Sequence, residues 1–118
     1  MDDERARRFA ERWYAAWNAH DLEAVLEHYA DDVGMTSPLV AGLAGREDGR
    51  IAGKAALGAY FAAALERYPD LRFEPIGLFV GIDSLVLHYK SVEGRLTAET
   101  VFLDENDMVT RYFAHYGG

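Results

Sequence analysis

The chain has 118 residues, half of them hydrophobic, with a formal net charge of −8 and no cysteine. This length and composition suit one domain with its own core, so we expect a single domain over residues 1–118. The negative charge disfavours nucleic acid and anionic membrane surfaces as partners, and the lack of cysteine excludes disulfides. Apolar runs are too short to cross a membrane and the charged N-terminus is unlike a signal peptide, so we expect a cytoplasmic protein.

Three segments have the composition and periodicity of helices. Residues 3–19 repeat apolar side chains every three to four positions, which predicts an amphipathic helix. A second helix is expected over residues 22–29, because Asp21 before it is a residue that favours a helix start. Residues 54–68 are rich in alanine and predict a third helix that ends before Pro69.

The remaining segments predict strands and turns. A short strand over residues 33–37 is expected to stop at Pro38, because proline has no N–H to donate to a sheet. Residues 39–50 hold three glycines among charged residues, which predicts a mobile surface loop at the mouth of a pocket. An antiparallel meander of four strands is predicted from alternating apolar and polar positions in residues 71–81, 85–92, 95–104 and 108–116.

This order of elements, together with several local sequences, resembles a known family. The resemblance rests on WNAHDLEAVLEHYADDV at residues 17–33 and on GKAALGAYF, YPDLRFE and VTRYFAHY further along. These strings are similar to parts of the nuclear transport factor 2-like superfamily, in particular its SnoaL-like and ketosteroid isomerase-like branches. The resemblance implies an α+β barrel, in which three helices wrap a cone-shaped, curved antiparallel sheet around an apolar pocket. It also implies a homodimer through the outer sheet face.

Ketosteroid isomerase activity itself is not expected from these residues. The family's carboxylate base stands before a proline on the first strand, where this chain has Ser37, and a neutral serine cannot take a proton from carbon unaided. The position of the family's oxyanion-hole tyrosine holds Trp13, which offers an indole N–H instead of a phenol. The family's third role, an acid on the sheet, matches Glu99.

A candidate catalytic set follows from pairing the strands across their turns. If residues 93–94 form a two-residue turn, His88 lies opposite Glu99, and a turn centred on residues 105–106 places Tyr112 on the other side of Glu99. Cross-strand neighbours of this kind are close enough to share hydrogen bonds. We therefore predict Glu99, His88 and Tyr112 as catalytic residues of a cofactor-free isomerase, cyclase, dehydratase or hydrolase.

Two alternatives to this set remain open. The opposite sheet face is more continuously apolar, so it can be the face that packs on the helices, which would leave His88 and Glu99 as an exposed pair. Ser37 with His88 and Glu99 has the composition of a nucleophilic triad, but no strained turn is expected around Ser37.

Aromatic side chains at helical spacing suit either a ligand pocket or a plain core. We predict that a small apolar or aromatic molecule contacts Trp13, Trp17, Met35, Ser37 and Tyr60. Phosphate-binding glycine motifs and metal-ligand spacings such as HExxH do not occur, so no cofactor and no metal is predicted. The function predicted is that of a SnoaL-like ligand-binding protein that uses acid/base catalysis. The alternative is a non-catalytic homodimeric interaction module with a filled cone.

Overall fold

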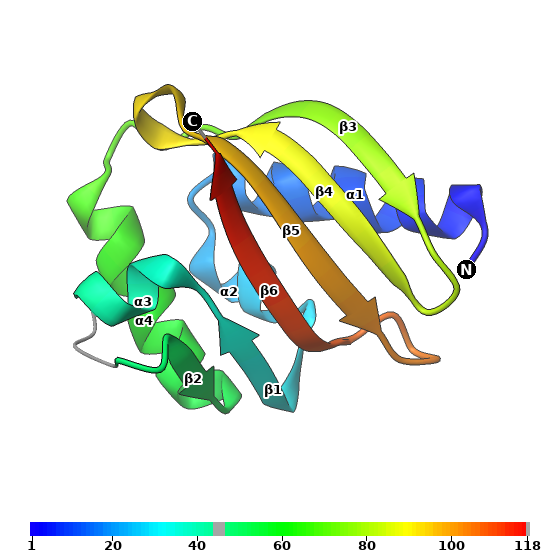
Figure 1. Ribbon diagram of the computed structural model, residues 1–118, viewed down its shortest axis with the longest axis horizontal. Helices are drawn as coiled ribbons and strands as arrows, with labels where there is room; N and C mark the ends of the chain where they lie inside the picture. Colours follow the sequence, from blue (N-terminus) through cyan, green and yellow to red (C-terminus); the bar gives the residue numbers. More distant parts are fainter. Residues whose placement is uncertain (44–46, 118) are drawn as a thin grey trace.

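A computed structural model describes residues 1–43 and 47–117, which fold as an α+β domain with helices covering one face of a curved sheet (Figure 1). Within these residues the sheet has six strands in the order β2-β1-β6-β5-β4-β3. Their bounds are β1 (Tyr29–Thr36), β2 (Arg50–Ala52), β3 (Glu74–Val80), β4 (Ser84–Lys90), β5 (Leu96–Leu103) and β6 (Val109–Gly117). Neighbouring strands are antiparallel except β1 and β6, which are parallel. The predicted α+β class is confirmed.

The helices are α1 (Asp3–Asn18), α2 (Leu22–Leu26), α3 (Pro38–Leu43) and α4 (Lys54–Arg67), and η1 (Val92–Gly94) is a 3-10 turn. Asp2 and Asp21 begin α1 and α2, because each side chain accepts a backbone N–H that the first helical turn leaves free. The helical period then buries Phe9, Trp13 and Trp17 of α1 on one side. In the described ranges, none of these helices combines the length and hydrophobicity that a membrane crossing requires.

Helix α3 and strand β2 correct the prediction of a loop over residues 39–50. Pro38 suits the first position of α3 because it has no N–H to leave unpaired, and the Ser37 hydroxyl oxygen accepts the Leu39 N–H at 3.2 Å. The Ser-Pro pair that ends β1 therefore also begins a helix. Strand β2 adds an antiparallel edge to β1. Residues 44–46 of the predicted loop lie outside the described residues.

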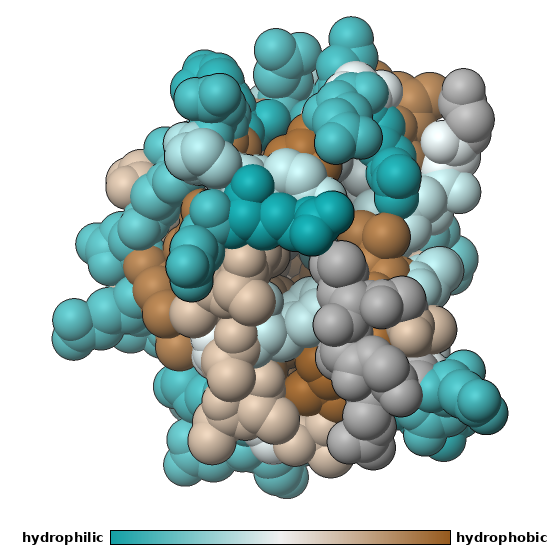
Figure 2. Space-filling view, turned by 90° about the vertical axis from the view of Figure 1, so that its left-hand side faces the viewer, coloured by the Kyte–Doolittle hydropathy of each residue, from teal (hydrophilic) through white to brown (hydrophobic). Residues whose placement is uncertain are grey.

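The core lies between the inner face of the sheet and the helices. Alternate residues of β4 and β5 are buried, as expected for strands with one covered face. The buried side chains of these two strands are Leu85, Leu87, Tyr89, Thr97, Glu99, Val101 and Leu103. Figure 2 shows the end of the molecule formed by α3, α4 and η1, where apolar side chains lie recessed between hydrophilic ones.

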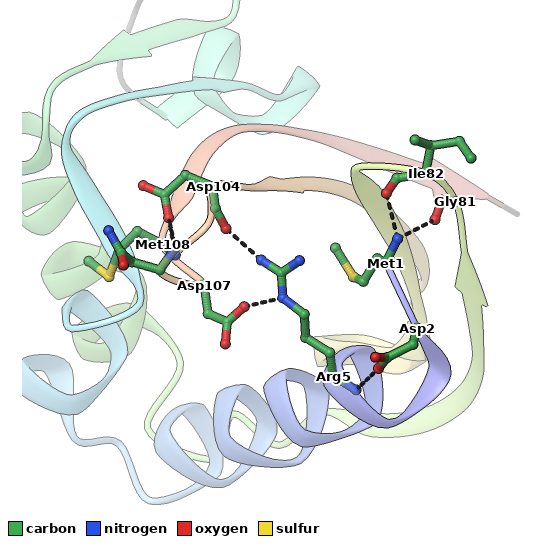
Figure 3. Close-up of polar contacts among 9 residues, drawn as sticks. Met1, Asp2, Arg5, Gly81, Ile82, Asp104, Asp107 and Met108 are labelled. Atoms are coloured by element: carbon green, nitrogen blue, oxygen red, sulfur yellow. Dashed lines mark hydrogen bonds and ion pairs between the residues drawn. The ribbon is translucent and has the colours of Figure 1, made fainter.

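Polar contacts attach the start of α1 to two sheet turns (Figure 3). The Arg5 guanidinium donates to the Asp104 carbonyl at 2.5 Å and pairs with the Asp107 carboxylate. On the other side, the Met1 amine nitrogen donates to the Ile82 carbonyl at 2.6 Å. These contacts help to hold α1 against the inner face of the sheet, where its aromatic side chains reach the interior.

Candidate functional site

A partly open cavity lies between the inner sheet face and helices α1 and α4. Its volume is about 80 Å³, which is below the several hundred cubic ångströms of a typical ligand site. Most of its wall is aromatic, from Trp13, Trp17, Tyr60, Phe61, Tyr68, Phe73, Tyr89, Tyr112 and Tyr116. A cavity of this size and composition suits a small apolar molecule, or one end of a larger molecule.

Glu99 is the acidic residue in this wall. Its side chain is buried, and one carboxyl oxygen, Oε1, accepts a hydrogen bond from the Tyr89 hydroxyl at 2.7 Å. The other oxygen, Oε2, has no partner among the described residues. Burial raises the pKa of Glu99 to about 7, although the hydrogen bond from Tyr89 acts in the opposite direction. Glu99 can therefore gain or lose a proton near neutral pH, as a general acid or base must.

Six tyrosines lie close enough to Glu99 for its charge to affect their hydroxyl groups. Burial raises the pKa of each of them above its ordinary value, and the charge of Glu99 raises it further; the tyrosines are Tyr14, Tyr29, Tyr60, Tyr89, Tyr112 and Tyr116. These phenols stay neutral at physiological pH. Glu99 is therefore the group in the described cavity wall that changes its charge near neutrality.

Two further buried polar groups in the described part of the chain have no hydrogen-bond partner, the Trp17 indole N–H and the Tyr14 hydroxyl. Trp17 and Glu99, which carry two of these unpartnered atoms, both line the cavity. Buried polar groups without partners are rare and call for an explanation such as a missing ligand or water. No group of three or more His, Asp or Glu side chains suited to a metal occurs within the ranges described.

The structure brings four of the five predicted ligand contacts to this cavity. Trp13, Trp17, Met35 and Tyr60 line it, and their role as ligand contacts stays a prediction. Ser37 is buried but is not one of the wall residues, and its hydroxyl oxygen accepts the Leu39 N–H at the start of α3. The prediction that placed Ser37 at the pocket therefore does not agree with the structure.

The turn between β4 and β5 is longer than the two residues predicted. Glu93 and Gly94 both have positive φ angles, 58° and 72°, within the 3-10 turn η1. The last strand pair before this turn is Lys90 opposite Leu96, whereas the predicted turn required Val92 opposite Arg95. The real register therefore differs from the predicted one by one residue.

This difference removes His88 from the predicted catalytic row. Leu87 lies opposite Glu99, and His88 points to the outer face, because a shift of one residue exchanges the two faces of a strand. Glu99 lies opposite Ala114, so Tyr112 is a diagonal neighbour on the same inner face. The predicted set of Glu99, His88 and Tyr112 was therefore wrong in its placement of His88. Glu99 and Tyr112 both line the cavity.

Tyr89 takes the place beside Glu99 that the prediction assigned to His88. It was not predicted as a site residue, because the assumed register put it on the other face. The signal in the sequence was the alternation Leu85, Leu87, Tyr89, which is more apolar than the intervening residues and marks the buried side of β4.

The fold and the cavity define a class of small α+β proteins in which helices and a curved sheet enclose an interior acid. Residues 10–116 match the SnoaL-like domain family, and the chain belongs to this family. The predicted resemblance is therefore confirmed. No match occurs among proteins with curated descriptions.

Solved structures agree with this assignment. A SnoaL-like protein of unknown function from Burkholderia thailandensis is 42% identical, with a TM-score of 0.95 over 100% of this chain and 99% of that chain. A candidate isomerase of the SnoaL-like family from Agrobacterium tumefaciens is 17% identical, with a TM-score of 0.77 over 98% and 99%. A nuclear transport factor 2-like protein of unknown function from Cytophaga hutchinsonii is 10% identical, with a TM-score of 0.75 over 95% and 89%. The last two show the fold alone.

Proposed function

We propose that this SnoaL-like protein binds a small apolar or aromatic molecule in the cavity and that Glu99 exchanges a proton with it. The observation that carries the proposal is the hydrogen bonding of the two Glu99 carboxyl oxygens. Tyr89 donates to one oxygen, the other has no partner among the described residues, and Glu99 lines a mostly aromatic cavity. A raised pKa in an apolar cavity is typical of catalytic carboxyl groups.

The chemistry available to this arrangement is cofactor-free proton transfer. Glu99 Oε2 accepts a proton from a weakly acidic group of the ligand and returns it to another atom of the same molecule, which is an isomerisation. The Trp17 indole N–H can donate to a ligand oxygen that gains negative charge during the transfer. Cyclisation, dehydration and hydrolysis use the same kind of proton exchange and belong to the same proposal.

Deuterium exchange tests the catalytic part without knowledge of the substrate. Small ketones and aldehydes are incubated with the protein in D₂O, and NMR follows the incorporation of deuterium next to the carbonyl. The wild type should accelerate the exchange for those compounds that enter the cavity, and Glu99→Gln should not. Glu105→Gln is the matched control, since it removes the same charge from an exposed turn. Equal rates in the wild type and Glu99→Gln would contradict the proposal.

A second candidate function is a non-catalytic homodimeric interaction module with a filled cone. The small cavity favours it, and so does the outer sheet face, where Phe79 and Leu96 are 60% and 38% exposed. Phe102 and Phe113 lie half-buried on the same face with their rings 6.2 Å apart. We propose that two copies pair through this face, because exposed apolar surface of this kind favours association.

Sedimentation measures whether the pair forms. Phe79→Asp should convert a dimer into a monomer while the circular dichroism spectrum stays unchanged. A wild type that remains monomeric at high protein concentration would contradict the dimer. Binding of small molecules in the cavity by this monomer would support the first function over the second.

A further inference from the structure

The described residues of the cavity wall include an acidic side chain but no basic one. Glu99 is the acid, and none of the described residues in the wall is Lys, Arg or His. Arg67 and Arg95 lie near the cavity, but both are exposed and contact Tyr68 and Tyr116 with their guanidinium carbons 5.6 and 5.5 Å from the ring centroids. The described part of the wall therefore has one acidic group and no basic group.

We propose that the ligand of this cavity is a small organic cation, an amine whose ammonium group lies against Glu99 Oε2. This inference rests on the proposed ligand-binding function and narrows its apolar ligand to one whose carbon skeleton carries an ammonium group. An ammonium group carries only N–H donors, and Oε2 is a buried acceptor that no donor of the described residues reaches. The pair would satisfy both the charge and the hydrogen bond.

Aromatic walls favour the same class of ligand. The electron-rich faces of tryptophan and tyrosine attract cations, and cages of such rings bind alkylammonium groups in other proteins. Trp13, Trp17, Tyr60 and Tyr112 are among the rings available here. A carboxylate or phosphate ligand would instead meet the charge of Glu99 with no cation to bind it. The net charge of −8 adds a long-range attraction for cations.

The size of the cavity limits the amine. A volume of about 80 Å³ has room for an ammonium head and a few carbon atoms, but not for a fused ring system. A larger amine would have to extend through the open side of the cavity. The binding group we infer is therefore an alkylammonium head on a small carbon skeleton.

Ionisation of Glu99 is required for this pairing. The titratable groups that face Glu99 are Tyr14 of α1, Tyr29 of β1, Tyr60 of α4, Tyr89 of β4, and Tyr112 and Tyr116 of β6. All six stay neutral below pH 9, because burial raises their pKa. Since the pKa of Glu99 is about 7, the carboxylate dominates at pH 8 and the neutral acid at pH 5.5. Amine binding should therefore be about tenfold or more weaker at pH 5.5.

A matched set of probes tests the inference: isobutylamine, isobutanol and isobutyrate, which differ mainly in charge. Dissociation constants at pH 8 come from the NMR shift of the Trp17 indole N–H, a group in the cavity wall. We expect the dissociation constant of isobutylamine to be lower than that of isobutanol by about tenfold or more. Isobutyrate should not bind. In Glu99→Gln the preference for the amine should disappear, and in Glu105→Gln it should persist.

Each other result overturns the inference in a distinguishable way. Isobutanol binding as tightly as isobutylamine to the wild type would show a neutral-ligand cavity, so the ligand cavity would stand and the amine would not. A preference for the amine that survives in Glu99→Gln would place the ammonium elsewhere on the acidic protein. No shift of Trp17 with any probe would contradict the ligand cavity itself and the amine with it. The comparison of probes needs only the wild-type protein, so it does not depend on the folding of a variant.

Discussion

The Tyr89 hydroxyl donates to Glu99 Oε1 at 2.7 Å, so a residue adjacent to the expected catalytic histidine holds the acid in place. The ring of Tyr89 is itself packed between aromatic neighbours, with centroids 4.5 Å from Phe73, 5.6 Å from Trp13 and 5.7 Å from Tyr14. This packing fixes the hydroxyl and thereby the orientation of the carboxyl. Glu99, which lines the cavity, therefore keeps one carboxyl oxygen, Oε2, without a hydrogen-bond partner among the described residues.

Tyr89→Phe should raise the pKa of Glu99 further above 7, because the hydroxyl that stabilises the carboxylate is lost. We also expect the free energy of unfolding to fall by about 1–2 kcal/mol. Carboxyl ¹³C NMR titration measures the pKa. Tyr112→Phe is the control, since that hydroxyl donates to the Met35 sulfur at 3.0 Å rather than to Glu99. An unchanged pKa in Tyr89→Phe would show that the hydrogen bond has no effect on Glu99.

Glu99 should make the stability of the protein depend on pH. Its ordinary pKa is 4.5 and its folded pKa is about 7, so between these values the unfolded chain binds fewer protons than the folded one. The stability of the wild type should therefore fall as pH rises from 4.5 to 7, by roughly 3 kcal/mol in total. Denaturant unfolding at pH 4.5 and pH 8, compared between wild type and Glu99→Gln, measures this difference. Parallel pH profiles for the two proteins would contradict the buried position of Glu99.

His88→Ala should leave the pKa of Glu99 unchanged, because His88 lies on the outer sheet face opposite Ala98. The same titration and any deuterium exchange activity should match those of the wild type. A shift in the pKa of Glu99 would instead support the register predicted from the sequence, in which His88 lies opposite Glu99. The variant therefore separates the two registers directly.

Asn18→Ala should destabilise the fold near the cavity. The Asn18 side chain accepts the Phe73 N–H at 2.7 Å and donates to the Phe73 carbonyl at 3.0 Å, which joins the end of α1 to the segment before β3. Loss of both bonds should lower the free energy of unfolding by about 1–3 kcal/mol. Thermal or denaturant unfolding measures the loss, with Asn106→Ala on an exposed turn as the control. A loss equal to that of the control would mean that the two bonds do not contribute.

Local sequence determined most of the elements of this fold. The helical period at Phe9, Trp13 and Trp17 predicted α1, and alternating residues predicted the four strands of the meander. Asp21 marked the start of α2 correctly. These signals succeed because a helix or strand repeats its own period, whatever the rest of the chain does. The Ser37-Pro38 pair was ambiguous, since proline both ends a strand and begins a helix.

Which side chains share the candidate site depended on tertiary structure, above all at the turn that contains Glu93 and Gly94. The sequence by itself identified Glu99 as a candidate acid and Tyr112 as its neighbour. Only the folded sheet showed that Tyr89, and not His88, shares the inner face with them. Side chains alternate between the two faces of a strand, so a difference of one residue in a turn exchanges every inward residue for an outward one. Which residues point inward is decided by the packing of the whole sheet on its helices.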